Sequence, residues 1–262
     1  PRVSGAVTAI HFQDGDYVRK GQLLFTIDQR PFRAALAEAR ASVASARSAL
    51  LLAKNDYARV QRLTGDEARL SLLPVPTWTP GKDIGPYITT TVMTRTIDTD
   101  NQNTGVYRTR VRDDHHVVVN MNPRRGGHDQ CATWWAQGKA APVAWVIGAE
   151  PAFQLAAVAT MPTGMQEMAV AGGLMGTPLE MVKCTTSDIL VPANAEIIIE
   201  GLVDPSERDT EGPFGENLGF MAGVSKKPVA RITAITHRKD PIYYGMSSQM
   251  PPSESTFLQS HS

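Results

Sequence analysis

Residues 197–202 read Ile-Ile-Ile-Glu-Gly-Leu, a run of branched apolar residues that is typical of a strand. Similar β-rich runs lie at 87–94, 107–111, 116–121, 144–147 and 229–236. Helical patches separate some of these runs, at 129–137, 151–159 and 164–172. This mixture predicts an α+β domain built on an antiparallel, barrel-like sheet with helices.

A short acidic motif follows this predicted strand, where residues 211–216 read Glu-Gly-Pro-Phe-Gly-Glu. A helix is disfavoured by Gly212 and Pro213, so the motif is predicted to be a shaped loop. Two carboxylates on such a loop, Glu211 and Glu216, are able to face one cleft, where one stays ionised while the other delivers a proton. The alternative from these six residues alone is a solvated acidic turn, since most glutamates are exposed.

The composition excludes several classes of function. The chain has 262 residues, a formal net charge of +0, 20% charged residues and 42% hydrophobic residues, which suits one large domain or two smaller ones. Zero net charge gives no electrostatic reason to expect nucleic acid as a partner. No window approaches the ~18 consecutive apolar residues of a membrane span. The two cysteines, Cys131 and Cys184, show no disulfide or zinc spacing, which favours a reducing compartment.

The first part of the chain has its own pattern. Short strands are predicted within residues 1–28, around glycine-bearing turns. Apolar or small residues then recur in steps of four and three over 29–64, which predicts a helix about 50 Å long with a coiled-coil seam. A proline- and glycine-rich stretch follows at 72–86, so we expect a domain boundary near residue 70.

Residues 15–24, Gly-Asp-Tyr-Val-Arg-Lys-Gly-Gln-Leu-Leu, resemble periplasmic adaptor (membrane-fusion, HlyD-like) proteins of efflux pumps. The resemblance implies half of a lipoyl-like domain in residues 1–28 and one arm of a helical hairpin in 29–64. The sequence around Lys20 is not the hairpin tip at which biotin or lipoate is attached. The alternative is an isolated amphipathic helix that folds back on the second domain.

Two basic features follow the boundary. Arg108 is able to clamp a carboxylate through two parallel hydrogen bonds or to hold one of the loop glutamates ionised, and the alternative is a surface arginine. Residues 124–128, Arg-Arg-Gly-Gly-His, form a basic glycine loop that suits a phosphate, although such a loop is more often only a turn. No Walker or Rossmann glycine motif is present.

Three polar residues offer a mixed ligand set for a divalent cation such as Mn²⁺: Asn103, His128 and Glu167. Their separation along the chain leaves their geometry open. A glutamate early in a helix, as Glu167 is predicted to be, is also stable there without any metal.

The second part of the chain contains a series of distinctive motifs, at residues 103–108, 161–167, 182–193, 196–201 and 211–216. Their order is that of the UbiD family of reversible decarboxylases, which residues 72–262 resemble. The resemblance implies a central UbiD domain over 69–262, incomplete at both ends. The chain also opens at Pro1 without a signal peptide, so we expect an incomplete or chimeric piece of a longer protein.

The family's functional residues transfer to matching positions of this chain. The resemblance implies a catalytic Glu–Arg–Glu set of Arg108, Glu211 and Glu216. It implies a site for prenylated FMN at Arg108, Gly127 and Met161. It implies metal ligands at Asn103, His128 and Glu167, which would bind Mn²⁺, with K⁺ as a further candidate ion.

The resulting hypothesis is a cytoplasmic carboxy-lyase from a homo-oligomeric family. Its reaction is the non-oxidative decarboxylation of an aromatic or α,β-unsaturated carboxylic acid, in which Glu216 donates the proton and Glu211 stays charged beside Arg108. Two alternatives remain open. One is a periplasmic adaptor of an efflux or secretion system, and the other is a non-catalytic flavin-binding module.

Overall fold

In a computed structural model of the chain, the described residues are 5–33, 36, 40, 43, 47, 61–159, 166–216 and 219–247. The chain divides into two compact units, Pro1–Ala53 and Lys54–Ser262. The sequence predicted the boundary near residue 70. The difference arises because β3 (Gln61–Thr64) pairs with β15 (Ser225–His237) and so belongs to the second unit.

The first unit contains the antiparallel pair β1 (Val7–Ile10) and β2 (Phe25–Ile27), in agreement with the short strands predicted there. The described residues of the predicted helix are helical at 30–33, 36, 40, 43 and 47. The predicted helix is wrong at its C-terminal end, because residues 61–64 are extended. Leu63 packs against the core of the second unit there, and the backbone pairs with a strand.

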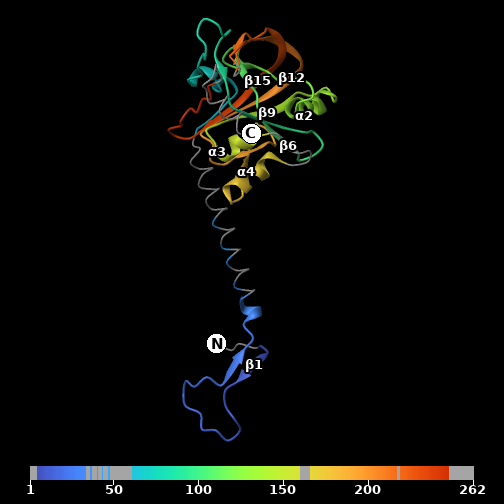
Figure 1. The fold of residues 1–262 in the computed structure, drawn as a ribbon. Helices are drawn as coiled ribbons and strands as arrows, with labels where there is room; N and C mark the ends of the chain where they lie inside the picture. Colours follow the sequence, from blue (N-terminus) through green and yellow to red (C-terminus); the bar gives the residue numbers. More distant parts are fainter. Residues whose placement is uncertain are drawn as a thin grey trace. The chain divides into compact units, whose positions relative to one another are not determined.

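The second unit is built on one antiparallel sheet with the order β4-β7-β8-β15-β12-β9-β5-β6, to which β3 is added at β15 (Figure 1). Its other strands are β4 (Tyr87–Ile88), β5 (Thr91–Arg95), β6 (Gln102–Val106), β7 (Thr109–Val111), β8 (His116–Val119), β9 (Ala141–Ile147) and β12 (Ile197–Glu211). Two small hairpins lie outside it: β10 (Met181–Lys183) with β11 (Leu190–Pro192), and β13 (Phe214–Gly215) with β14 (Met221–Ala222). The short 3₁₀ helices are η1 (Gly65–Glu67) and η2 (Leu70–Leu72).

In the part of the chain that the structure describes, the α-helices beside this sheet are α2 (Gly126–Trp135), α3 (Pro151–Val158) and α4 (Glu167–Met175), close to the positions that the sequence predicts. Proline at the first helical position is preorganised for the start of α3. Gly176, at a φ of 68°, ends α4 in the left-handed conformation that glycine favours. The prediction of an α+β fold with a barrel-like antiparallel sheet and helices is confirmed.

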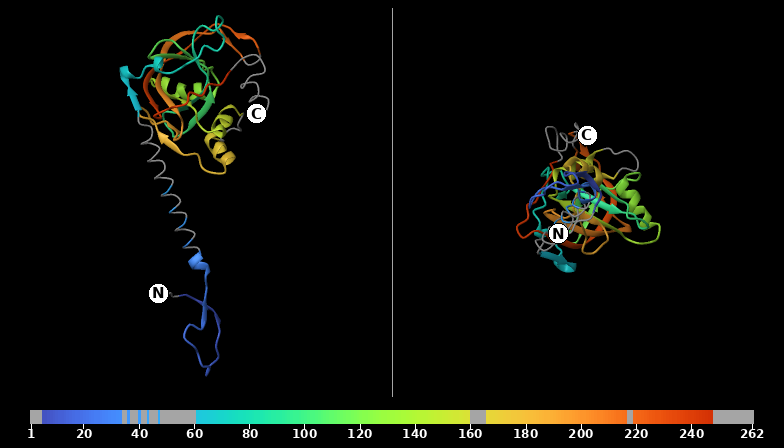
Figure 2. Two further views of the ribbon diagram at one scale, coloured as in Figure 1. Left: turned by 90° about the vertical axis from the view of Figure 1, so that its left-hand side faces the viewer. Right: turned by 90° about the horizontal axis from the view of Figure 1, so that it is seen from below.

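The sheet separates two apolar cores by the alternation of its side chains. In β9, Val143, Trp145 and Ile147 face the core inside the curl of the sheet. Their neighbours Ala144 and Val146 face a second core, which α3, α4 and the β10–β11 hairpin help to cover. Figure 2 shows how the strands of this unit curl around the inner core. Arg108, directly before β7, and Glu211, the last residue of β12, lie at strand ends of this curled sheet.

Candidate active site

Arg108 and Glu211 form a buried, two-pronged ion pair. Arg108 stands directly before β7, and Glu211 is the last residue of β12. The Nε of Arg108 lies 2.7 Å from Oε1 of Glu211, and its Nη2 lies 2.9 Å from Oε2. The side chain of Glu211 is 0% exposed and that of Arg108 is 13% exposed. This parallel geometry is the strongest form of arginine–carboxylate pairing.

The same guanidinium also reaches the second glutamate of the motif. Nη1 of Arg108 donates a hydrogen bond to Oε1 of Glu216, whose side chain is 40% exposed. The backbone N–H of Glu216 donates to the carbonyl of Phe220 at 2.7 Å, beside the β13–β14 hairpin. The structure therefore brings the three predicted catalytic residues together, with one carboxylate sealed from solvent and one open to it. The motif is only partly a loop, since Glu211 ends a strand.

The electrostatics of the cluster favour a permanently charged arginine. Burial alone disfavours the charged guanidinium of Arg108. The hydrogen bonds and negative charges of Glu211 and Glu216 outweigh this effect and raise the pKa of Arg108 above its ordinary value. Arg108 therefore remains a cation at any working pH.

Tyr87 is a component of the site that the sequence did not reveal. Its hydroxyl donates to Oε1 of Glu211 at 3.3 Å and accepts the N–H of Gly212 at 3.1 Å. Its ring packs against Phe214 with centroids 4.4 Å apart, and the guanidinium of Arg108 lies 5.1 Å from the centroid of the same ring. The strand prediction over 87–94 located this tyrosine, but no local signal links it to an acid 124 residues away.

The environment of Tyr87 predicts a specific loss of stability in alkali. Burial, and secondly the charge of Glu211, raise the pKa of Tyr87 to about 12 from an ordinary value of 10. The stabilisation is complete below pH 10 and is lost as the pH rises to about 12, because the unfolded chain loses this proton first. Two pKa units correspond to about 3 kcal/mol.

Urea unfolding at pH 9 to 12 measures this effect. Tyr87→Phe is expected to flatten the alkaline decrease relative to the parent chain, while Tyr17→Phe, a change to a fully exposed tyrosine, leaves it unchanged. Equal alkaline decreases in all three proteins would contradict the assignment.

The motif contains one position where only glycine fits. Gly212 has a φ of 84°, and a Cβ built there would lie 2.4 Å from the carbonyl oxygen of Gly223. We expect Gly212→Ala to destabilise the chain by about 2 kcal/mol or more, because the backbone must shift as well as adopt a strained angle. Gly223→Ala is the matched control, since its added methyl meets nothing within 4 Å. Equal melting temperatures for the two variants would contradict this prediction.

A second polar cluster lies at the N-terminus of α2. The basic glycine loop predicted at 124–128 is partly wrong, because Gly126 to His128 form the first turn of this helix. A Cβ at Gly126 would clash with the side-chain amide of Asn103, so the glycine lets this side chain approach the helix end. The amide oxygen of Asn103 accepts the backbone N–H groups of Gly127 at 3.3 Å and Thr104 at 3.2 Å. The N–H of Gly127 donates to the hydroxyl of Tyr107 at 2.9 Å. Asn103, a predicted metal ligand, and Gly127, a predicted cofactor contact, therefore lie close together.

The other predicted ligand positions are arranged differently. Glu167 begins α4, and its charge acts on Tyr107, whose pKa is raised mainly by burial. His128 instead lies edge-on to Trp135, with ring centroids 5.4 Å apart, and its Nδ1 is 3.4 Å from Asp129. Among the described residues, no group of three or more His, Cys, Asp or Glu side chains is arranged to hold a metal ion. Met161 lies outside the described residues.

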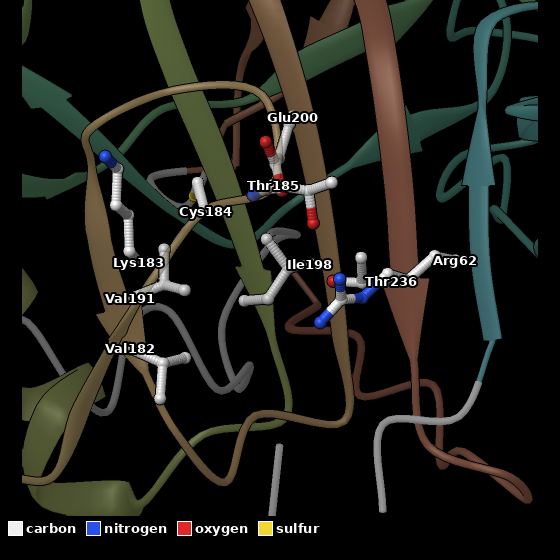
Figure 3. Close-up of a pocket in the computed structure, with 9 residues that line it drawn as sticks. All are labelled: Arg62, Val182, Lys183, Cys184, Thr185, Val191, Ile198, Glu200 and Thr236. Carbon is white, nitrogen blue, oxygen red and sulfur yellow. Dashed lines mark hydrogen bonds between the residues drawn. The ribbon is translucent and has the colours of Figure 1, made fainter. Parts of the chain in front are cut away.

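A second buried carboxylate among the described residues, Glu200, has a structural role. It accepts hydrogen bonds from the backbone N–H groups of Thr185 and Thr186 and from the hydroxyl of Thr186, each at 2.7 Å. The pocket beside it, which Arg62 also lines, measures only about 20 Å³ (Figure 3). That volume is comparable to a single water molecule. Glu200 therefore fastens the β10–β11 connection to β12 and offers no room for a substrate.

Fold and site together define an α+β protein whose curled antiparallel sheet presents a guanidinium between two carboxylates. Residues 52–251 match the UbiD family, described as the 3-octaprenyl-4-hydroxybenzoate carboxy-lyase Rift-related domain. The chain belongs to the UbiD family. The match begins at residue 52, so the resemblance of residues 15–24 to adaptor proteins stays a prediction.

Solved structures of UbiD-class enzymes agree with this assignment. The enzyme HmfF of Pelotomaculum thermopropionicum, in complex with FMN, is 35% identical with a TM-score of 0.70 and shares 76% of this chain and 44% of its own. The vanillic acid decarboxylase of Sedimentibacter hydroxybenzoicus in its closed form is 29% identical with a TM-score of 0.73, over 78% of this chain and 44% of its own. The 3,4-dihydroxybenzoic acid decarboxylase of Klebsiella pneumoniae is 25% identical with a TM-score of 0.68, over 78% and 45%. The chain thus spans less than half the length of these relatives.

Proposed function

We propose that the chain carries the catalytic centre of a carboxy-lyase that decarboxylates an aromatic or α,β-unsaturated carboxylic acid non-oxidatively, with prenylated FMN as cofactor. The observation that carries this proposal is the guanidinium of Arg108 held between Glu211 and Glu216. The relatives support it, since HmfF was solved with FMN and with prenylated FMN, and two others are named as decarboxylases of aromatic acids.

The two glutamates suit different roles. Bound prenylated FMN would accept the electron pair that the departing CO₂ leaves on the substrate, a task that side chains cannot perform. Glu216 is open to solvent, so it takes up a proton from water and delivers it to the carbon that lost CO₂. Glu211 is sealed from solvent, stays a carboxylate and holds Arg108 in place. General acid catalysis of this kind contributes a factor of about 10²–10⁴.

Two features of the helix end at α2 support a phosphate and metal site there, its polar side chains and its N-terminus. Asn103 lies at this helix end and offers an amide oxygen, and Glu167 begins α4 and offers a carboxylate, which are oxygen donors of the kind Mn²⁺ accepts. Helix N-termini favour anionic groups, and Arg124 and Arg125 precede this one. We propose Asn103, Glu167 and His128 as ligands of Mn²⁺, with K⁺ as a further ion, and Gly127 and Met161 as cofactor contacts.

Manganese binding is directly measurable. Titration of the chain with Mn²⁺, followed by the electron paramagnetic resonance signal of the free ion, is expected to show a site that Glu167→Gln weakens about tenfold or more, because a carboxylate ligand is lost. The control Glu180→Gln should bind as the parent chain does. Unchanged affinity in Glu167→Gln would remove this residue from the ligand set.

We further propose a small carboxylic acid as the partner, a homo-oligomeric full-length protein and a cytoplasmic location. The evolved form of HmfF is described as dimeric. The sequence has two cysteines without disulfide or zinc spacing, Cys131 and Cys184, which favours a reducing compartment. Among the helices that the structure describes, none is both long and apolar enough to cross a membrane.

The test is reconstitution of the 262-residue chain with prenylated FMN, followed by measurement of CO₂ release from a panel of aromatic and α,β-unsaturated acids. Release of CO₂ that depends on the flavin supports the proposal. Flavin absorbance without CO₂ release would indicate a non-catalytic flavin-binding module instead. A chain that binds no flavin would contradict both functions.

A further inference from the structure

Three arginines face three acids in a regular order on two separated strand segments. Alternate residues of an extended segment share one face. The pairs, which we name the arginine ladder, are Arg108–Glu211, Arg110–Asp209 and Arg112–Glu207. The middle pair joins Nη2 of Arg110 to Oδ2 of Asp209 at 2.8 Å, and the outer pair joins Nη1 of Arg112 to Oε1 of Glu207 at 2.6 Å. The two segments run antiparallel, since the residue numbers rise along one from Arg108 to Arg112 and fall along the other from Glu211 to Glu207. Each ion pair, or rung of the ladder, therefore joins positions that lie opposite each other.

The ladder connects strands that do not pair. In the sheet, β7 and β12 are separated by β8 and β15. Backbone hydrogen bonds therefore link the end of β12 to β7 only indirectly, through β15 and β8. The side-chain rungs are the direct connection between these two segments that the described residues show.

This connection matters because β12 loses its regular register shortly before the acidic motif. Val203 pairs with Ala230, but the next pair is Arg208 with Pro228. Between these two pairs β12 moves on by five positions and β15 by only two, so β12 bulges. Inside this bulge, Oδ1 of Asp204 accepts the backbone N–H of Ser206 at 2.7 Å, which closes a local turn. The four residues from Arg208 to Glu211 therefore resume pairing with β15 in a shifted register. The arginine ladder is a second, side-chain anchor for that register.

The rungs become less exposed toward the site. In the outer pair, the side chains of Arg112 and Glu207 are 25% and 46% exposed, whereas those of Arg110 and Asp209 are 12% and 31% exposed. Screening by water weakens exposed pairs most, so the middle rung contributes more than the outer one. Lys226 lies 4.0 Å from Asp209 and adds positive charge on the same side.

We propose that Arg110 and Asp209 are positioning residues, whose ion pair fixes the register of the end of β12 and so holds Glu211 opposite Arg108. They act through Glu211 and do not contact the reacting atoms. The catalytic meaning of this arrangement rests on the proposed function. The positioning itself can be tested without turnover, so the two proposals can fail independently.

Amide hydrogen exchange of the full chain is the test, with residues 211–216 as the reporter and β9 as the reference for global stability. We expect Asp209→Asn to speed exchange in 211–216 about tenfold or more while β9 exchanges as in the parent chain. The control Asp100→Asn breaks the ion pair of Arg95 with a side chain that is 97% exposed. It should leave the reporter unchanged.

Charge exchange distinguishes positioning from a general structural role. The double variant Arg110→Asp with Asp209→Arg rebuilds the rung with reversed polarity and should restore the reporter to within about threefold of the parent chain. Parental exchange in Asp209→Asn, equal acceleration in β9, or no recovery in the double variant would overturn the proposal. If Asp209→Asn does not fold, the double variant alone is the test. A folded double variant whose amides in 211–216 are protected supports the proposal, and an unfolded one overturns it.

Discussion

Glu216→Gln is expected to lower CO₂ release by the flavin-loaded chain by a factor of about 10²–10⁴, while flavin binding persists. Glutamine has nearly the shape of glutamate and can still accept a hydrogen bond from Arg108 through its amide oxygen. It has no acidic proton to deliver to the carbon that CO₂ leaves. The change therefore removes the chemistry of Glu216 and preserves the contact that the structure shows with Nη1 of Arg108.

The measurement is single-turnover CO₂ release together with the flavin absorption spectrum, for the parent chain and the variant. Glu67→Gln, at an exposed position of η1, is the matched control and should keep parental turnover. Parental turnover in Glu216→Gln would exclude this residue as the proton donor. Loss of flavin together with activity would instead show that the side chain helps to bind the cofactor.

The spacing of apolar residues predicted the helices and strands of the second unit well, because this spacing follows which faces of each element are buried. In β9, alternate side chains face two different cores, and the branched residues that open β12 are buried on both faces. The predicted helix over 29–64 failed at residues 61–64. The local heptad pattern cannot indicate that residues 61–64 pair with β15, because this partner strand lies more than 160 residues away along the chain.

The site was predicted from the resemblance to a family, and not from spacing. Arg108 is 103 residues from Glu211 along the chain, and no local sequence pattern indicates that the two side chains are in contact. Tyr87 was missed for the same reason, since its role exists only once the sheet is formed. The middle rung of the arginine ladder was missed because its partners are ordinary surface residue types, Arg110 and Asp209, until the register of two strands aligns them.

Arg108→Gln is expected to destabilise the second unit by about 3–5 kcal/mol, because it leaves the carboxylate of Glu211 buried without a counter-charge. Glu211 is 0% exposed, and its remaining side-chain partner is the hydroxyl of Tyr87 at 3.3 Å. A single neutral hydrogen bond is too weak to replace the ionic, two-pronged contact. Urea unfolding at pH 7 measures the loss as a change in the free energy of unfolding.

Two further variants show whether the buried charge is the cause. The double variant Arg108→Gln with Glu211→Gln removes both charges and should recover most of the stability, because no ion is left unpaired. Arg112→Gln, at the exposed outer rung, should cost less than about 1 kcal/mol. If Arg108→Gln costs no more than Arg112→Gln, the inner pair is not the charge-compensated centre described above. If the double variant is instead less stable than Arg108→Gln, removal of the unpaired charge has not restored the stability. The stabilisation would then come from the hydrogen bonds of Arg108 to both acids.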